Sequence, residues 1–200
     1  AEYYVLLLSS ALGMLITASA NDFLTIFVGI ELSAFSSYGL VAFRKTNDKS
    51  TEAGAKYLLI GAFSSALTLY GISLLYALTG SVTFEGVNAF LTGLENGVID
   101  GDFNELVFIS SLFIIAGLGF KIAVVPFHAW APDVYEGAPT PVTALLAAAS
   151  KAMGFVALLK VFIFTLEPFA DEWKLVFGII ALVSMTVGNL AALSQKDIGR

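Results

Sequence analysis

Long apolar runs separated by short polar segments occupy most of the chain. A helix that crosses the hydrocarbon core of a bilayer needs about 20 mostly apolar residues. Six runs approach or exceed that length, covering residues 3–20, 23–43, 54–78, 106–130, 142–166 and 175–193. The pattern predicts an all-α fold, a polytopic transmembrane helix bundle with six spans in a single domain that covers residues 1–200.

The fourth run contains a predicted helix break at Pro126. Proline lacks the backbone N–H that a helix needs, and its ring clashes with the preceding turn. Because Pro132, Pro139 and Pro141 follow, we expect no helix to resume before Val142. Irregular backbone at membrane depth is tolerated only inside protein or beside water, so the break marks a candidate functional position.

The long linker between the third and fourth runs has a short amphipathic pattern. Apolar residues recur there at helical spacing, at Phe84, Val87, Phe90, Leu91 and Leu94. This spacing predicts a short helix that lies in the membrane interface. A flexible loop is the alternative.

Composition supports the membrane assignment. The chain is 58% hydrophobic and 13% charged, whereas soluble domains are about 45–50% apolar and about 25% charged. A soluble six-helix core is the alternative, but helices that are apolar all round leave no polar face for water. The chain has no cysteine, which excludes disulfides and iron–sulfur ligation, and a net charge of −6 argues against nucleic acid as a partner.

Basic residues indicate the orientation of the spans. If the spans alternate in direction, only Lys174 falls on one face, and six basic residues fall on the other. These six are Arg44, Lys45, Lys49, Lys56, Lys196 and Arg200. The positive-inside rule therefore predicts that the N-terminus of this chain lies on the cytoplasmic side and the long linker outside.

Four ionisable side chains lie within the spans, at Glu31, Lys121, Lys151 and Lys160. Each costs at least about 2.5–3.5 kcal/mol at a helix centre, and such groups usually mark ion or proton pathways or pair across helices. At 1.5 Å per residue, Glu31 lies roughly 12 Å and Lys151 roughly 13 Å into its span, so both share a layer with Lys121. We expect these three residues to form a proton relay; a static Glu31–Lys121 salt bridge is the alternative.

Two further residues are weaker candidates for the relay. Lys160 lies nine residues after Lys151, on the opposite helix face, and close enough to the outer end for its ammonium to reach water. That position favours snorkelling over a role at the end of the relay. His128 follows the break, and because histidine is a common proton shuttle at physiological pH, it is a candidate to pass protons to the inner face. A hydrogen-bonded structural histidine is the alternative.

The segment KIAVVPFHAWAPDVYEGAPTPVTALLAAASKAMG, residues 121–154, resembles the antiporter-like membrane subunits of respiratory complex I and the related Mrp-type antiporters. Within it, PDVYEGAPTPV is most similar to the N-type subunit. The resemblance implies that the six spans are helices four to nine of a fourteen-helix subunit, which is one five-helix repeat plus the first helix of its inverted partner. It also implies that Glu31 is the glutamate of the fifth helix, Lys121 the lysine of the broken seventh and Lys151 the proton-carrying lysine of the eighth.

The resemblance implies a proton-translocating subunit of an NADH:quinone-type oxidoreductase. NADH, FMN, iron–sulfur clusters and quinone would be bound by other membrane and peripheral subunits, with no cofactor or metal held by this chain. It implies a bacterial or archaeal cell membrane, although an organellar inner or thylakoid membrane also fits. An Mrp-type cation/proton antiporter subunit is the alternative function, and a scaffold whose charges only pin helices is a third.

Overall fold

The computed structural model describes residues 1–99, 101 and 103–195, so Lys196 and Arg200 of the predicted inner face lie outside the described residues. Within this part of the chain, six helical segments are long and apolar enough to cross a membrane. They are Glu2–Ser19 (α1), Phe23–Val41 (α2), Asp48–Thr79 (α3), Asn104–Ile122 (α5), the rod Thr140–Thr165 that contains α7 and α8, and Glu167–Leu193, most of which is α9. The six predicted spans are confirmed, although α3 begins at Asp48 rather than at residue 54.

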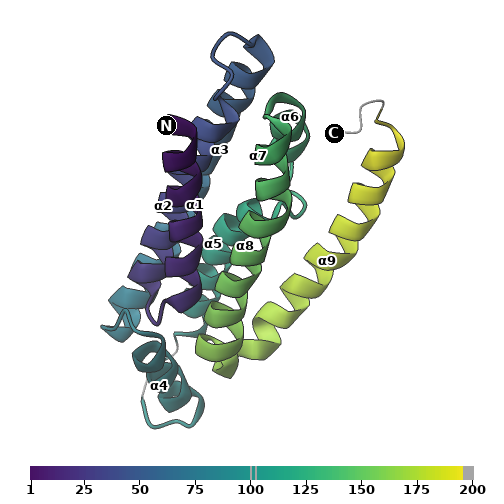
Figure 1. The fold of residues 1–200 in the computed structure, drawn as a ribbon. Helices are drawn as coiled ribbons and strands as arrows, with labels where there is room; N and C mark the ends of the chain where they lie inside the picture. Colours follow the sequence, from purple (N-terminus) through teal and green to yellow (C-terminus); the bar gives the residue numbers. More distant parts are fainter. Residues whose placement is uncertain (100, 102, 196–200) are drawn as a thin grey trace.

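Helices α1 and α2 lie side by side along a seam of small residues (Figure 1). A Cβ atom added to Gly13 would lie 2.5 Å from the backbone nitrogen of Ser33, so the two backbones approach more closely than larger side chains allow. The Ser10 hydroxyl lies 3.2 Å from that of Ser33 and 3.3 Å from that of Ser37. Small residues and hydroxyl pairs of this kind hold helices together where lipid provides no hydrophobic drive.

The predicted helix break is present near Pro126, but its start and its extent differ from the sequence-based prediction. Helix α5 ends at Ile122, where Ala123 adopts a left-handed conformation (φ 58°), so the break begins before Pro126. The prediction that no helix resumes before Val142 is also wrong, because Trp130–Gly137 forms α6 and Thr140–Leu145 forms α7. The prolines at 132 and 141 lie in the first turns of these helices, where a missing N–H has no intrahelical partner to lose.

The chain crosses the break with a specific hydrogen bond. The indole Nε1–H of Trp130 donates to the carbonyl oxygen of Phe120 at 3.0 Å, so a side chain from α6 adds a second hydrogen bond to a carbonyl that also accepts from Ala123 N at 3.1 Å. On the far side of the loop, the backbone N–H of Val125 donates to the hydroxyl of Ser184 in α9 (Ala170–Leu193) at 3.0 Å. The irregular segment is therefore anchored to two helices, although Pro126 and Ala129 within it are exposed.

The linker helix α4 (Phe84–Glu95) crosses the end of the bundle opposite the N-terminus (Figure 1). The Thr83 hydroxyl caps it by accepting from Gly86 N at 3.1 Å. Val87 and Leu91 are completely buried in the main core cluster, so the predicted helix is confirmed and the flexible-loop alternative is wrong. Its depth relative to the bilayer interface stays a prediction.

The rod that carries Lys151 and Lys160 is not a uniform α-helix. Two π-helical segments, Leu146–Ser150 and Leu159–Thr165, flank helix α8 (Lys151–Leu158). Lys151 follows the first segment directly, and Lys160 lies in the first turn of the second. π-Helical turns are rare and occur frequently at functional sites.

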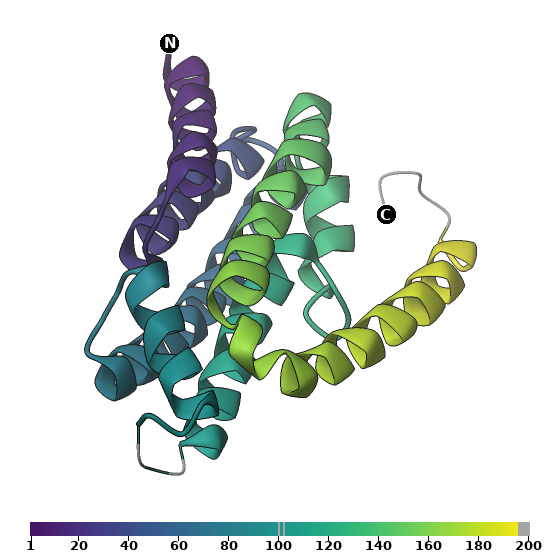
Figure 2. The same cartoon turned by 90° about the horizontal axis from the view of Figure 1, so that it is seen from below.

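Helix α9 stands apart from the other spans. It diverges from the bundle along most of its length (Figures 1 and 2), and none of its described residues is buried. Near its start, Trp173 and Phe177 pack against Phe162, with ring centres 5.6 and 5.0 Å away. These rings anchor the beginning of α9, while Ser184 provides its contact with the break.

Candidate functional site

Glu31 on α2 and Lys121 on α5 line the same small cavity, which α3 closes on a third side. Its volume is about 20 Å³, enough space for one water molecule. Tyr38, Ser65 and Thr68 contribute to the wall. The structure thus brings together two of the charged residues that the sequence predicted to share a layer, although they lie 90 positions apart (121 − 31).

Lys121 is the more enclosed member of the pair. Its side chain is 3% exposed, and its Nζ atom is buried without a hydrogen-bond partner. Among the described residues, no carboxylate lies within ion-pair distance of this Nζ atom. A buried ammonium without an acceptor is costly, so the site favours a lysine that changes its charge or its partner.

Glu31 is held by α3 instead of by Lys121. Its Oε1 atom accepts a hydrogen bond from the Ser65 hydroxyl at 2.5 Å. The same hydroxyl lies 3.1 Å from the carbonyl oxygen of Gly61, one turn earlier in α3. The geometry therefore places the carboxylate of Glu31 beside a neutral donor, within the cavity that it shares with the lysine.

Lys151 lies outside this cavity and contacts an aromatic ring. Its Nζ atom is 5.6 Å from the ring centre of Tyr135 on α6, a cation–π distance. The Tyr135 hydroxyl is buried without a hydrogen-bond partner, and burial raises the pKa of Tyr135 to about 12. At neutral pH this residue is therefore an uncharged phenol that presents its ring to the lysine.

An aromatic cluster connects the two lysine environments. Tyr38, which lines the cavity, meets Tyr57 edge-on with ring centres 4.8 Å apart. Tyr57 stacks on Trp130 at 4.7 Å, and Trp130 meets Tyr135 at 5.9 Å. Phe120, the residue before Lys121, packs against Trp130 at 5.1 Å. These ring contacts run without a gap from the wall of the cavity to the ring that Lys151 contacts.

His128 and Pro126 both lie in the loop between α5 and α6. The Nδ1 atom of His128 is buried without a hydrogen-bond partner, whereas Pro126 is exposed and lines an apolar hollow with Phe127 and Trp130. Neither residue lines the cavity shared by Glu31 and Lys121. The structure therefore places the histidine on the break and apart from the carboxylate.

Lys160 contacts the other end of the bundle. Its Nζ atom donates to the carbonyl oxygen of Ala20 at 2.6 Å, at the C-terminus of α1. A cation is favoured there because helix C-termini carry partial negative charge. This lysine extends toward the end of its span, as the sequence suggested, but its ammonium binds a protein carbonyl.

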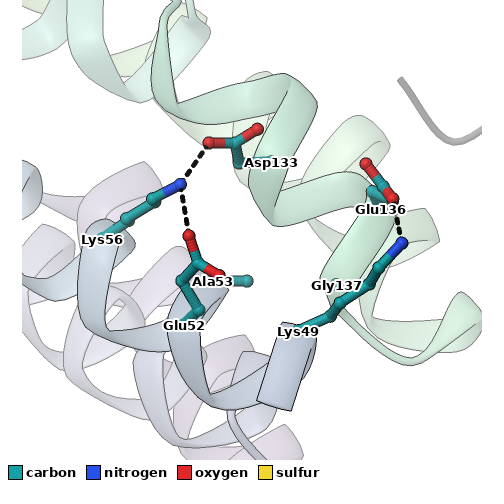
Figure 3. A pocket seen from close by; sticks show the side chains of 7 residues that line it. All are labelled: Lys49, Glu52, Ala53, Lys56, Asp133, Glu136 and Gly137. Atoms are coloured by element: carbon teal, nitrogen blue, oxygen red, sulfur yellow. Dashed lines mark hydrogen bonds and ion pairs between the residues drawn. The ribbon is translucent and has the colours of Figure 1, made fainter. Parts of the chain in front are cut away.

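A cluster of ion pairs joins α3 to α6 on the face that carries the N-terminus (Figure 3). Lys56 contacts Asp133 at 2.7 Å and Glu52 at 2.7 Å, and Lys49 contacts Glu136 at 2.6 Å. They surround a cavity of about 210 Å³. Exposed ion pairs stabilise little one by one, but this group fixes the short helix that follows the break.

Residues 20–200 match the family described as NADH:quinone oxidoreductase/Mrp antiporter, transmembrane. The chain belongs to this family. It is 46% identical to NADH-quinone oxidoreductase subunit N from Desulfitobacterium hafniense, covering 100% of this chain and 39% of that protein. Subunit N from Heliobacterium modesticaldum is 47% identical, with 100% and 40% covered. The chain thus spans about 40% of the length of these relatives.

Solved structures show the same fold. The chain is similar to a subunit of respiratory complex I from Thermus thermophilus, with 36% identity and a TM-score of 0.80 over 99% of this chain and 40% of that chain. An archaeal membrane-bound sulfane sulfur reductase gives 29% identity and a TM-score of 0.83, covering 98% and 39%. The Mrp complex from Dietzia sp. gives 21% identity and a TM-score of 0.79, covering 95% and 34%, and shows the fold alone. The protein is an integral, multi-pass membrane protein of this antiporter-like family.

Three contributors to the site are not predicted by the sequence: Ser65, Tyr135 and the α3–α6 ion pairs. A serine in a span gives no signal by itself, because serines also occur throughout the α1–α2 seam. Tyr135 had one available signal, since it lies within the PDVYEGAPTPV motif directly after the break. Lys49 and Lys56 were interpreted only as inner-face charges, although their spacing of seven places both on one helix face.

Proposed function

We propose that this chain forms part of the N-type membrane subunit of a proton-translocating NADH:quinone oxidoreductase. The observation that carries the proposal is the enclosure of Glu31 and Lys121, on neighbouring helices, around one buried cavity. The identity of 46–47% to subunit N proteins supports the N-type assignment. In the complete subunit these spans would be helices four to nine of fourteen, with the inverted repeat beginning at α9.

In the proposed mechanism, Glu31 controls the charge of Lys121. Burial disfavours the charged form of a lysine, and an adjacent carboxylate favours it. When Glu31 approaches Lys121, the lysine holds a proton; when Glu31 returns to Ser65, the buried ammonium loses its counter-charge and releases that proton. Lys151 then receives it, and the Tyr135 ring stabilises the new ammonium. The three groups titrate as a coupled set.

We propose that the electron-transfer chemistry takes place in partner subunits. NADH, FMN, iron–sulfur clusters and quinone would bind there, and the pumping energy would reach this chain as conformational or electrostatic change. The complex would lie in a bacterial or archaeal cell membrane, with the N-terminus of this chain in the cytoplasm. The basic residues Arg44, Lys45, Lys49 and Lys56 support that orientation.

The proposal is tested with Lys121→Ala and Glu31→Gln in the complete subunit, assembled in its complex and reconstituted into liposomes. Both variants should abolish proton pumping and slow the coupled reduction of quinone, because each removes one partner of the switch. The exposed Lys45→Ala variant is the matched control and should pump at the wild-type rate. Unchanged pumping in Lys121→Ala would contradict the proposal.

The same preparations separate the alternatives. Purification with flavin and iron–sulfur subunits supports the oxidoreductase, whereas purification without them would support an Mrp-type antiporter. If the charges only pin helices, the neutral pair Glu31→Gln with Lys121→Met should preserve both assembly and pumping. The likeness to the Mrp complex concerns the fold alone.

A further inference from the structure

Ser65 has one hydroxyl hydrogen and two acceptors within reach. Its Oγ atom lies 2.5 Å from Oε1 of Glu31 and 3.1 Å from the carbonyl oxygen of Gly61. Because a hydroxyl donates a single hydrogen, the two bonds alternate. The shorter distance favours the charged acceptor, since hydrogen bonds to carboxylates are shorter and stronger than neutral ones.

The other α3 hydroxyls that line the cavity donate to backbone carbonyls instead of to Glu31. Ser64 donates to the carbonyl oxygen of Gly117 on α5 at 2.9 Å, and Thr68 donates to that of Ser64 at 3.0 Å. Among the described residues, Ser65 provides the one hydrogen bond to Glu31. The carboxylate is therefore held on the α3 side by a single donor.

Lys121 is the competing partner on the opposite wall. Its Nζ atom is buried without an acceptor, and its side chain lines the same cavity of about 20 Å³ as Glu31 and Ser65. A rotation of the Glu31 side chain toward α5 would exchange a hydroxyl donor for an ammonium donor. After that exchange Ser65 still has the Gly61 carbonyl, so neither position of the carboxylate leaves the hydroxyl unsatisfied.

We propose that Ser65 is a positioning residue that holds Glu31 away from Lys121 and so sets how readily the lysine releases its proton. This inference rests on the proposed function. It adds the Ser65 hydroxyl as a second hydrogen-bond partner for the Glu31 carboxylate, besides the Lys121 ammonium. Removing the hydroxyl leaves Glu31 with the ammonium as its main partner. The balance then moves toward the ion pair by roughly tenfold or more, the factor that corresponds to about 1.4 kcal/mol.

The test compares Ser65→Ala and Ser65→Thr in the full complex in liposomes, with pumping normalised to assembled complex. Ser36→Ala is the matched control, because Ser36 makes the same kind of bond to a carbonyl one turn earlier, to Leu32 at 2.8 Å, without touching a carboxylate. Ser65→Ala should lower the pumping rate by roughly tenfold, Ser65→Thr should restore it, and Ser36→Ala should leave it unchanged.

A spectroscopic measurement separates positioning from simple packing. In redox-induced infrared difference spectra, the carboxylate band that Glu31→Gln abolishes should shift in Ser65→Ala, return in Ser65→Thr and stay in place in Ser36→Ala. If Ser65→Ala fails to assemble, Ser65→Cys, a weaker donor, should show a partial shift of the same band.

The outcomes distinguish the two proposals. An effect of Glu31→Gln on pumping together with wild-type pumping and an unshifted band in Ser65→Ala would overturn the role of Ser65 alone. Wild-type pumping in Glu31→Gln would overturn the proposed function itself. Equal losses in Ser65→Ala and Ser36→Ala, with the band unmoved, would also overturn the positioning role, because they would indicate a general packing effect.

Discussion

At the scale of single residues, the two lysines of the proposed relay have different neighbours. Lys121 shares its cavity with a carboxylate, whereas Lys151 faces the ring of Tyr135 at 5.6 Å. An aromatic face stabilises an ammonium without binding a proton, so it assists arrival of the charge without competing for it. These neighbours fit the proposed roles, in which Lys121 donates the proton and Lys151 receives it.

We expect Tyr135→Leu to lower the pumping rate by about two- to thirtyfold, the range that corresponds to a cation–π contact of about 0.5–2 kcal/mol. Tyr135→Phe keeps the ring and should retain most of the rate. Because the pKa of Tyr135 is about 12, the phenol stays protonated, so Tyr135→Phe should also leave the pH profile unchanged between about pH 6 and 9. Proton-pumping assays across that range check both expectations; equal losses in Leu and Phe variants would assign the effect to the hydroxyl.

At the scale of elements, α6 depends on partners that lie far away in the sequence. It has only eight residues, too few for a stable isolated helix. The Trp130 indole ties its start to α5, and the ion pairs to Lys49 and Lys56 tie it to α3. Its position is therefore set by tertiary contacts.

Lys56→Gln removes the contacts to both Glu52 and Asp133 at once. We expect faster local opening of α6, seen as roughly twofold faster hydrogen–deuterium exchange over residues 130–137. Lys174→Gln, which affects an exposed ion pair to Asp171, is the matched control and should leave exchange in α6 unchanged. Exchange that is identical in both variants would show that the ion pairs do not hold α6.

Hydrophobic length predicted the six spans well because membrane thickness fixes how long they must be. The start of the break was harder to predict, since a local proline rule cannot foresee the left-handed Ala123 or the bond from the Trp130 indole to the Phe120 carbonyl. The enclosure of Glu31 and Lys121 followed from the cost of buried charge. The contributions of Ser65 and Tyr135 could not be predicted in this way, because they depend on which helices become neighbours in the fold.

At the scale of the whole molecule, the absence of cysteine offers a direct test of orientation. In the complete subunit, made free of any other cysteine, we expect Lys45→Cys to react with a membrane-impermeant maleimide only in inside-out vesicles. Lys174→Cys should react only in right-side-out vesicles, because the charge asymmetry places these exposed residues on opposite faces. Labelling in the reverse pattern would invert the predicted topology.

The bond from the Trp130 indole to the Phe120 carbonyl also has a mechanical meaning. The helix is interrupted between α5 and α6, but this bond links the last turn of α5 directly to the first residue of α6. The loop that joins the two helices, residues 123–129, lies between these two bonded residues. His128 lies on that loop, so the loop can rearrange around it while the bond between Trp130 and Phe120 keeps the end of α5, and with it Lys121, in place.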